Sequence, residues 1–393
     1  MPSPEKSDRP YDIVLLGATG FAGGLTADYL AGAMPAEGRW ALAGRNAPKL
    51  AAVRDRLGTQ HPGREAPGVL HADVNDPASL RALAEQTRVV ITTVGPYLEH
   101  GEPLVAACAA AGTDYVDLTG EPEFVDRMFL AHHDRATATG ARLVHACGFD
   151  SIPHDLGVLF TVRQLPHDVP LTVRGVVRSN AKISGGTLHS AVGQIARLRS
   201  LAAAARERRR REASGLDAAR IAALPRRDAL LGYWLLPLPG IDAQIVARSA
   251  RARAEYGPRF TYGHYMGFRR LRTAVGAAVG AVGFAIAAQI PLLRRRLIAR
   301  IPAGEGPSEE RRRKSWFTVD FVGEGGGQRV HTRVSGGDPG YTETATMLAE
   351  SALSLAFDDN PKTAGQVTTA AAMGDHLVDR LQAAGIRFTT VSS

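Results

Sequence analysis

The sequence predicts an α/β fold in which a doubly wound parallel sheet is followed by a second, α+β domain on a mostly antiparallel sheet. Two observations support this. Between residues 12 and 145, short apolar runs alternate with segments of helical periodicity, which is typical of a parallel sheet with right-handed crossovers. From Ser151 onward this alternation stops, and strand-like runs take over, the first of them with one polar face.

A glycine-rich turn follows the first apolar run. The first three elements are predicted as a buried strand, a helix and a second strand, at residues 12–16, 25–33 and 40–43. The turn after the first strand has the spacing G-x-x-G-x-x-G. Gly17 allows a sharp turn, Gly20 leaves room for a pyrophosphate, and Gly23 lets the helix pack closely on the sheet.

This turn is predicted to bind the phosphates of a dinucleotide. Free N–H groups and the positive end of the helix dipole meet at the start of the helix, where they attract anions. The spacing alone is common, but its place between a strand and a helix is typical of a Rossmann-type domain. The alternative is a turn that binds nothing. The predicted phosphate-binding residues are Gly17, Thr19, Gly20, Phe21 and Gly23.

The end of the second strand predicts NADP(H) as the cofactor. An NAD site places Asp or Glu there for the ribose 2′-hydroxyl, whereas an NADP site places a cation for the 2′-phosphate. Here the strand ends in Gly44, Arg45 and Asn46, with no carboxylate. The Arg45 guanidinium can form paired hydrogen bonds with a phosphate. In the alternative, Asn46 caps the next helix and Arg45 points into water.

The remaining elements of the first domain alternate in the same way. Helices are predicted at residues 47–57, 77–86, 102–111 and 124–139, and strands at 68–73, 89–93, 115–118 and 141–145. Asp73 ends a strand, where its carboxylate can meet an adenine amino group or a loop N–H, or cap the next helix. Val94, Gly95 and Pro96 follow the fourth strand, and we expect them to face the ribose or nicotinamide.

The second half of the chain is predicted to carry the antiparallel sheet. Strands are expected at residues 171–178, 244–248, 260–265, 316–322 and 328–334, and helices at 343–357 and 370–384. A helix from Gly185 is expected to continue into the basic run 206–211, followed by a mobile connection at 213–228. The predicted domains are 10–150 for nucleotide binding, 151–365 for substrate or partner, and 366–393 as a C-terminal helix and tail.

Composition indicates a globular protein of a reducing compartment. The 393 residues are 45% hydrophobic and 22% charged, and the two cysteines, Cys108 and Cys147, predict neither a disulfide framework nor a metal site. Residues 1–10 carry no apolar signal core, which predicts a cytoplasmic protein.

The net charge of +8 is concentrated in arginine-rich runs, which favour an anionic membrane surface over nucleic acid because no nucleic-acid motif accompanies them. Solvated helix faces are the alternative. The runs are residues 206–211, 294–296 and 311–314.

The chain resembles the saccharopine dehydrogenase-like oxidoreductases, at residues 17–23, 43–45, 94–97, 115–121 and 148–153. Within that family it looks most like the actinobacterial trans-acting enoyl reductases, including the stretches 184–187 and 339–341. Ala22 stands where the family usually has Thr, a change of small effect because backbone groups hold the phosphates. The resemblance implies reduction by NADPH of a lipid-like or polyketide-derived enoyl chain carried by a synthase, in lipid or glycolipid biosynthesis. The alternative within the family is a saccharopine-type amino-acid dehydrogenase.

An uncharged apolar segment, residues 273–293, lies between two arginine clusters. Its length could span a bilayer, but a single crossing would separate residues 316–334 from the sheet they should complete. We therefore expect a helix or helical hairpin in the interface, with arginines on anionic headgroups, at the inner face of the plasma membrane. The alternatives are a helix buried in the second domain or at a homodimer seam, and a true span.

Enoyl reduction needs a hydride, a group that polarises the thioester oxygen, and a proton donor. Tyr97, beside the loop expected at the nicotinamide, is the first candidate, followed by His154 and Asp150 after the sixth strand. Each has a structural alternative: Tyr97 packs on the ribose, Asp150 caps the helix from Ile152, and His154 is an ordinary hydrogen-bonded side chain. A non-catalytic, membrane-attached scaffold that keeps NADP as a structural ligand is a further alternative.

Overall fold

The computed structural model describes residues 6–181, 185–212, 219–222, 224–299 and 306–391, which divide into two compact units. The first unit holds the described residues up to Thr119, then Phe124–Phe149 and Tyr341–Ala384. The second holds Gly120–Glu123, the described residues of Asp150–Gly340, and those from Gly385 onward. The chain therefore leaves the first unit at residue 150, beside the predicted domain boundary, and returns to the first unit at Tyr341. The predicted domains did not include this return.

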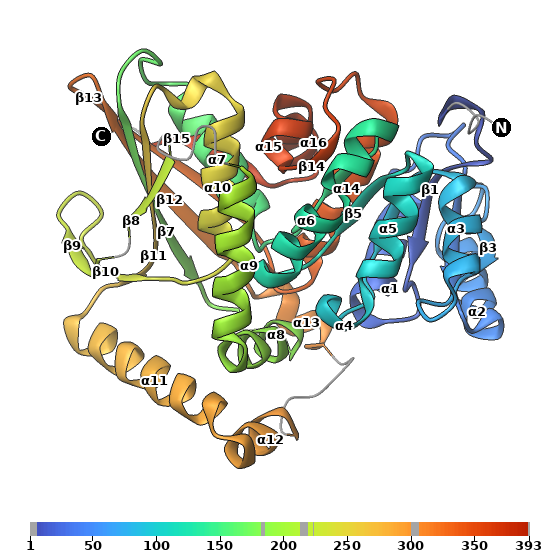
Figure 1. Cartoon of the computed structure of the whole chain (residues 1–393), viewed down its shortest axis with the longest axis horizontal. Helices are drawn as coiled ribbons and strands as arrows, with labels where there is room; N and C mark the ends of the chain where they lie inside the picture. The colour runs from blue at the N-terminus through green and yellow to red at the C-terminus, as the bar shows by residue number, and fades with distance from the viewer. Residues whose placement is uncertain (1–5, 182–184, 213–218, 223, 300–305, 392–393) are drawn as a thin grey trace. The chain divides into compact units, whose positions relative to one another are not determined.

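The first unit is built on a 7-stranded sheet with the order β14-β6-β5-β4-β1-β2-β3 (Figure 1). Every neighbouring pair is parallel, which confirms the predicted doubly wound sheet. The chain order reverses between β1 and β4, and in such sheets this switch point is where ligands bind. The strands are β1 (Tyr11–Leu16), β2 (Trp40–Gly44), β3 (Gly68–His71), β4 (Thr87–Thr92), β5 (Asp114–Asp117), β6 (Arg142–Val144) and β14 (Gly365–Val367).

Helices cover this sheet in two layers. Helix α3 lies against α5, while α1 lies against α14, and α14 also packs on β1, β4 and β5 (Figure 1). The predicted helix 370–384 is interrupted at Gly374, whose φ of +51° is outside the helical region. The helices are η1 (Lys6–Asp8), α1 (Phe21–Ala33), α2 (Ala47–Gln60), α3 (Pro77–Glu85), α4 (Tyr97–His100), α5 (Glu102–Ala111), α6 (Pro122–Thr139), α14 (Thr342–Phe357), α15 (Thr369–Ala372) and α16 (Asp375–Ala383).

The second unit is built on an 8-stranded sheet with the order β15-β13-β12-β7-β11-β10-β9, and β8 also pairs with β11. Among the described strands, the parallel pairs are β11 with β7 and β11 with β8, and all other pairs are antiparallel. The sheet is therefore mixed but mostly antiparallel, as predicted. The strands are β7 (Leu171–Ser179), β8 (Ala219–Ala222), β9 (Arg226–Asp228), β10 (Tyr233–Pro237), β11 (Phe260–Phe268), β12 (Phe317–Gly325), β13 (Gln328–Gly336) and β15 (Arg387–Thr390).

Helix α7 packs on β7, β12 and β13, and α10 packs on α7, β8 and β11. Nearly every residue of α7 is buried, so this helix forms the core of the second unit with the inner face of the sheet. The helices are α7 (Ile152–Val162), α8 (Gly185–Ala196), α9 (Leu198–Arg211), α10 (Asp242–Ala252), η3 (Ala254–Tyr256), α11 (Leu271–Gln289), α12 (Pro291–Ala299) and α13 (Glu309–Arg313).

Several predictions for the second unit were wrong. The expected strand 244–248 lies inside α10, because the short apolar run is one face of a helix whose buried residues include Ala243, Val246 and Ala250. The expected mobile connection contains β8 and β9, and its residues 213–218 and 223 lie outside the described part of the chain. The expected single helix from Gly185 breaks at Arg197 into α8 and α9. Ser184, part of a stretch used for the resemblance, also lies outside the described residues.

Candidate functional site

The turn after β1 is held in shape by contacts within the first unit. Gly17 has a φ of +98°, and a Cβ there would lie 2.6 Å from Thr93 Oγ1. A Cβ on Gly23 would collide with the Gly17 carbonyl and lie 2.7 Å from Thr93 Oγ1. Gly23 therefore lets α1 pack closely on the turn and on Thr93, which directly follow the sheet strands β1 and β4. The turn and the loop after β4 meet here, at the switch point.

Gly20 has a different environment. It is exposed, and a Cβ there would meet only Gly17 O at an ordinary 3.4 Å. Packing within the protein therefore does not require glycine at this position, whereas close approach of a phosphate does. Gly20 is also the N-cap of α1 and makes no side-chain capping bond, so the first turn of the helix presents backbone N–H groups beside the exposed Thr19. These features fit a pyrophosphate.

Phe21 contributes to the turn mainly through its backbone. Its ring packs edge-on against Tyr341, with 4.9 Å between the ring centroids. The first residue of α1 is thus anchored by the segment that returns to the first unit near residue 341.

Arg45 directly follows β2 and is exposed, with no hydrogen bond or ion pair assigned to it within the described residues. Asn46 does cap α2, as one alternative proposed, because its side chain accepts a hydrogen bond of 3.0 Å from Lys49 N. This cap leaves the Arg45 guanidinium available for a phosphate. No carboxylate stands at the end of β2, so the geometry fits a 2′-phosphate better than a ribose 2′-hydroxyl.

Asp73 follows β3, and its side chain forms a hydrogen bond within the loop that contains it. Its carboxylate accepts a hydrogen bond of 2.9 Å from Asn75 N, which is the predicted loop N–H. Its alternative role as a helix cap was wrong, since Asp76 caps α3 by accepting from Ala78 N at 3.0 Å. A contact between Asp73 and an adenine stays a prediction.

The loop after β4 separates into an exposed part and a buried part. Gly95 and Pro96 are exposed and Val94 is half-buried, as a loop that meets a cofactor requires. Tyr97 is buried, and its hydroxyl donates to Thr92 O and accepts from Leu118 N, both at 3.1 Å. The hydroxyl therefore joins the ends of β4 and β5, and the geometry favours a structural role over proton donation.

Asp117, at the end of β5, is a buried hub that our sequence analysis missed. Its carboxylate accepts hydrogen bonds from Tyr115 Oη at 2.9 Å and Ala146 N at 2.9 Å, and lies 2.6 Å from His145 Nδ1. It thereby fixes the loops that follow β5 and β6. A carboxyl group at the end of a predicted buried strand was the signal that could have identified it, because a buried polar group requires hydrogen-bond partners.

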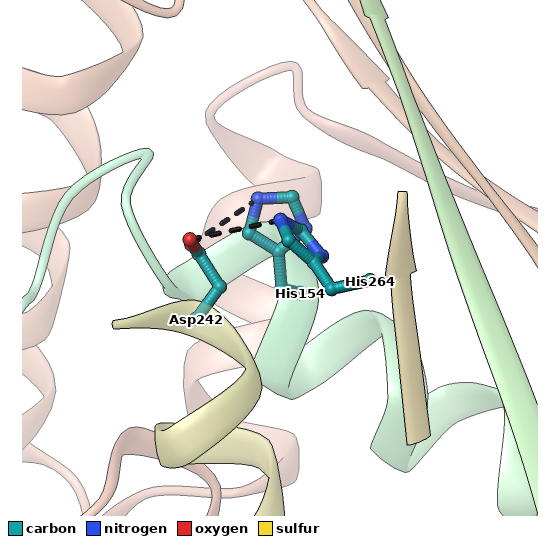
Figure 2. Close-up of side chains that lie close together, drawn as sticks. All are labelled: His154, Asp242 and His264. Carbon is teal, nitrogen blue, oxygen red and sulfur yellow. Dashed lines mark ion pairs between the residues drawn. The ribbon is translucent and has the colours of Figure 1, made fainter. Parts of the chain in front are cut away.

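A second polar cluster lies in the core of the second unit. His154 comes from α7, Asp242 from α10 and His264 from β11, and Figure 2 shows both imidazoles turned toward the carboxylate. Asp242 Oδ1 lies 3.4 Å from His154 Nε2, and Asp242 Oδ2 lies 3.6 Å from His264 Nε2. Only His154 was identified from the sequence, because Asp242 lies just before the predicted strand 244–248 and His264 was one residue of the predicted strand 260–265.

Burial controls the charges of this cluster. Desolvation lowers the pKa of His154 to about 3 and also lowers the pKa of His264, so both imidazoles are neutral near pH 7. Burial and the negative charge of Asp242 raise the pKa of Asp150 to about 7. His154 is therefore a poor proton donor at neutral pH, whereas Asp150 suits that task. Asp150 does not cap α7, whose N-cap is Ser151.

The sequence pattern of the saccharopine dehydrogenase NADP binding domain matches residues 13–144, which span the turn, Arg45 and the loop after β4. A Mycobacterium tuberculosis protein whose name assigns it to the trans-acting enoyl reductases is 40% identical over 413 residues, covering 97% of this chain and 98% of the relative. A trans-acting enoyl reductase of Mycobacterium bovis is 37% identical over 419 residues and covers 97% of both chains. The chain belongs to the trans-acting enoyl reductase family.

The predicted resemblance and cofactor are confirmed by this membership. The first unit is an NADP-binding domain, and this member of the trans-acting enoyl reductase family is an NADP-dependent oxidoreductase. Among solved structures, apo saccharopine dehydrogenase (L-Glu forming) from Saccharomyces cerevisiae has the same fold, with a TM-score of 0.56 at 14% identity. That match covers 97% of this chain and 100% of the yeast chain.

Proposed function

We propose that this chain is an NADPH-dependent trans-acting enoyl reductase that reduces an enoyl thioester presented by a separate synthase, in the biosynthesis of a lipid or glycolipid. The observation that carries the proposal is the pairing of an open phosphate-binding turn at Gly20 with an exposed Arg45 after β2. The names of relatives that match along nearly the whole chain support the reaction class.

The residues of the first unit bind and orient the cofactor. The N-terminus of α1 holds the pyrophosphate, Arg45 binds the 2′-phosphate, and the exposed backbone at Gly95 approaches the ribose or nicotinamide. When bound, NADPH supplies the hydride for the β-carbon of the enoyl group, and a proton at the α-carbon completes the saturation. Among the predicted candidates, Asp150 is the proton donor whose pKa suits neutral pH.

Fluorescence titration of NADPH and NADH tests the cofactor part of the proposal. We expect wild-type protein to bind NADPH more tightly than NADH, and Arg45→Ala to weaken NADPH at least tenfold while leaving NADH unchanged. The matched control is Arg135→Ala, because Arg135 is an exposed arginine near the C-terminal end of α6, away from the carboxyl ends of the strands. Tight NADH binding by the wild type would contradict the proposal.

Turnover separates the enzyme from a scaffold. Purified protein with NADPH and a series of enoyl thioesters, free and carrier-bound, should show oxidation of NADPH at 340 nm that depends on the acyl chain. Tight NADPH binding without turnover of any enoyl thioester would favour the non-catalytic scaffold. Turnover of a soluble amino acid instead would favour the saccharopine-type dehydrogenase.

We also propose that the second unit attaches peripherally to an anionic membrane, at the inner face of the plasma membrane. Among the described residues, α11 alone is long and apolar enough to span a bilayer, and only 11% of its apolar window is buried. The alternative of a helix buried in the second unit is therefore wrong. Its exposed apolar residues recur every three or four positions and form one stripe: Leu271, Val275, Val279, Val282 and Ile286.

The charges and the topology around α11 favour a helix lying in the interface. Exposed arginines stand at both ends, at 269, 270, 272, 295 and 296, and they complement anionic headgroups. A single crossing would separate β11 from β12, although both pair with β7. Helix α12, with 9 residues, is too short to cross back.

Co-sedimentation with vesicles tests this attachment. We expect binding to vesicles that contain phosphatidylglycerol, weaker binding to phosphatidylcholine alone, and at least tenfold less binding by the double variant Val279→Ser, Val282→Ser. Leu224→Ser, which changes an exposed leucine elsewhere in the second unit, is the control. No vesicle binding, together with a dimer that the double variant abolishes, would instead place α11 at a homodimer seam.

A further inference from the structure

The cluster of His154, Asp242 and His264 does not have the geometry of direct hydrogen bonding. Two other His–Asp pairs among the described residues lie at hydrogen-bonding distance: His145 Nδ1 lies 2.6 Å from Asp117 and His331 Nε2 lies 2.8 Å from Asp320. In the cluster, by contrast, the nitrogen–oxygen distances are 3.4 and 3.6 Å. A buried imidazole and carboxylate that interact only with each other are expected to close to hydrogen-bonding distance.

The wider spacing matches ligands arranged around a common ion. Two ligands that each lie about 2.0–2.1 Å from a tetrahedral zinc are about 3.3–3.4 Å apart. One ligand atom from each of His154, Asp242 and His264 lies within 4.8 Å of the others. The three side chains converge from three separate elements, α7, α10 and β11 (Figure 2). Small side-chain movements would therefore complete a coordination shell.

Two polar atoms of the cluster are buried without a hydrogen-bond partner among the described residues. They are Asp242 Oδ1 and His264 Nε2, and each belongs to a side chain with at most a tenth of its surface exposed. Leaving such atoms unsatisfied is costly, so their presence needs an explanation. An ion held between them would satisfy both.

Neighbouring groups prepare these side chains for a metal. Tyr262 Oη lies 3.1 Å from His264 Nδ1, so a hydrogen bond donated by Nδ1 would leave the Nε2 lone pair for the ion. Gly175 makes room for this hydroxyl, because a Cβ there would collide with it. Asp242 is the first residue of α10, and its side chain lies at the N-terminal end of this helix.

We propose that His154, Asp242 and His264 form a binding site for a divalent transition-metal ion, with zinc as the best fit. Two neutral imidazoles and one carboxylate are a donor set that suits zinc or iron(II), and calcium and magnesium prefer oxygen ligands alone. Three protein ligands leave one position open, where an oxygen ligand would be polarised. The sequence analysis expected no metal site, because it considered the cysteines and did not bring these three residues together.

Metal binding by the full-length protein tests the proposal without NADPH or acyl substrate, so its outcome does not depend on the proposed function. Protein freed of metal with EDTA is titrated with Co²⁺, whose tetrahedral complexes absorb visible light. We expect an absorption band that saturates at one ion per chain and is abolished by one equivalent of Zn²⁺. The absence of both the band and Zn²⁺ uptake in the wild type would overturn the proposal, and this measurement needs no variant.

Variants locate the ion. His264→Gln should lose the Co²⁺ band, and Tyr262→Phe, which keeps all three ligands, should weaken Zn²⁺ binding about 10–100-fold. His331→Gln, which alters a His–Asp pair at hydrogen-bonding distance, is the matched control and should bind like the wild type. Zn²⁺ affinity and stoichiometry in His264→Gln equal to those of the wild type would show that the ion binds elsewhere and would overturn the assignment.

Discussion

The glycines of the turn after β1 have different neighbours. This difference distinguishes a glycine that the fold requires from one that the binding of a cofactor requires. Gly23 is surrounded by the turn itself, whereas Gly20 has open space in front of it. Gly24, one residue further along α1, is also unhindered, since the nearest atom to its Cβ would be Ala18 O at 3.8 Å. A series of alanine variants can therefore distinguish a residue that shapes the turn from one that admits a ligand.

We expect Gly20→Ala to retain the melting temperature of the wild type and to lose at least tenfold in NADPH affinity, because its methyl group would occupy the phosphate position. Gly23→Ala should lower stability by about 1–3 kcal/mol through overpacking against the Gly17 carbonyl. Gly24→Ala is the control: it should leave NADPH affinity unchanged and raise stability by up to about 1 kcal/mol, because alanine favours the helix more than glycine does. Equal NADPH affinity in Gly20→Ala and the wild type would contradict a phosphate site at this turn.

Asp150 gives a prediction about the pH dependence of the reaction. A proton donor with a pKa of about 7 is charged at higher pH, so the turnover rate of the wild type, assayed free of divalent metal ions, should fall as the pH rises above 7. Asp150→Asn should lower kcat by about 10²–10⁴-fold below pH 7, a difference that shrinks as the pH rises, and should leave NADPH affinity unchanged. The exposed Asp168 supplies the control, Asp168→Asn. A wild-type profile without a decrease above pH 7, or full activity in Asp150→Asn, would remove Asp150 as the donor.

Single residues also mark the limit of what the sequence predicts. Gly17, Gly20 and Arg45 could be predicted as cofactor-binding residues because this role follows from a local pattern beside one strand, and it stays a prediction. Asp242 and His264 could not, since packing of α10 and β11 against α7 brings them to His154 from distant parts of the chain. Tyr97 shows the opposite error, because its position near the cofactor loop says nothing about the direction of its hydroxyl.

At the level of elements, long segments with a clear period were predicted well. Strands β1 to β6 of the first sheet and helix α14 were predicted within a few residues of their ends. The prediction was wrong for α10, because a short apolar run is compatible with both the helical and the strand period. It also missed β9, β10 and β14, which have only three to five residues each. Such short strands form because they pair with the edge of an existing sheet, and the local sequence does not show that this edge is near.

Helix α14 is joined to α16 by a network of ion pairs. Arg380 donates to Asp358 Oδ1 at 2.8 Å and to Glu350 Oε2 at 3.1 Å, and Tyr29 on α1 donates to Glu350 Oε1 at 2.6 Å. Burial would raise the pKa of Asp358, but the hydrogen bonds and charge of Arg380 hold it below its usual range. This network connects the returning segment to the first helix of the unit.

Because the pKa of Asp358 is lowered on folding, the pair stabilises the protein above about pH 4, and this contribution is lost as the pH falls further. We expect Asp358→Asn to lower the free energy of unfolding at pH 7 by about 1.5–3 kcal/mol, a difference from wild type that shrinks toward pH 3. The neighbouring exposed residue gives the control, Asp359→Asn. Thermal unfolding of all three proteins across this range provides the comparison, and a pH-independent difference would argue against the ion pair.

For the whole molecule, the first unit is assembled from both ends of the chain. Residues Tyr341–Ala384 supply β14 at the edge of the sheet and α14 over β1, β4 and β5. The sequence predicted helix α14 but not its location, because a helix of ordinary amphipathic composition does not specify which sheet it covers. The pattern of the NADP-binding domain ends at residue 144 and likewise leaves this segment out.

A fragment of residues 1–149 should therefore fail to fold stably, although it contains every predicted nucleotide-binding residue. We expect it to be aggregated or partly unfolded and to bind NADPH at least 100-fold more weakly than the full chain. Joining residues 341–384 to its end through a flexible linker should restore a cooperative thermal transition and most of the NADPH affinity. A stable, NADPH-binding fragment 1–149 would show that α14 and β14 are dispensable.

Both sheets receive their outermost strand from the last part of the chain, β14 beside β6 and β15 beside β13. During translation, β6 and β13 stay unpaired on these sides until residues 365–367 and 387–390 have been synthesised. An uncovered strand edge pairs readily with other chains, so a chain that lacks β14 and β15 would expose an aggregation-prone strand in each sheet. A truncation before residue 365 would therefore remove one strand from each sheet and damage both units together.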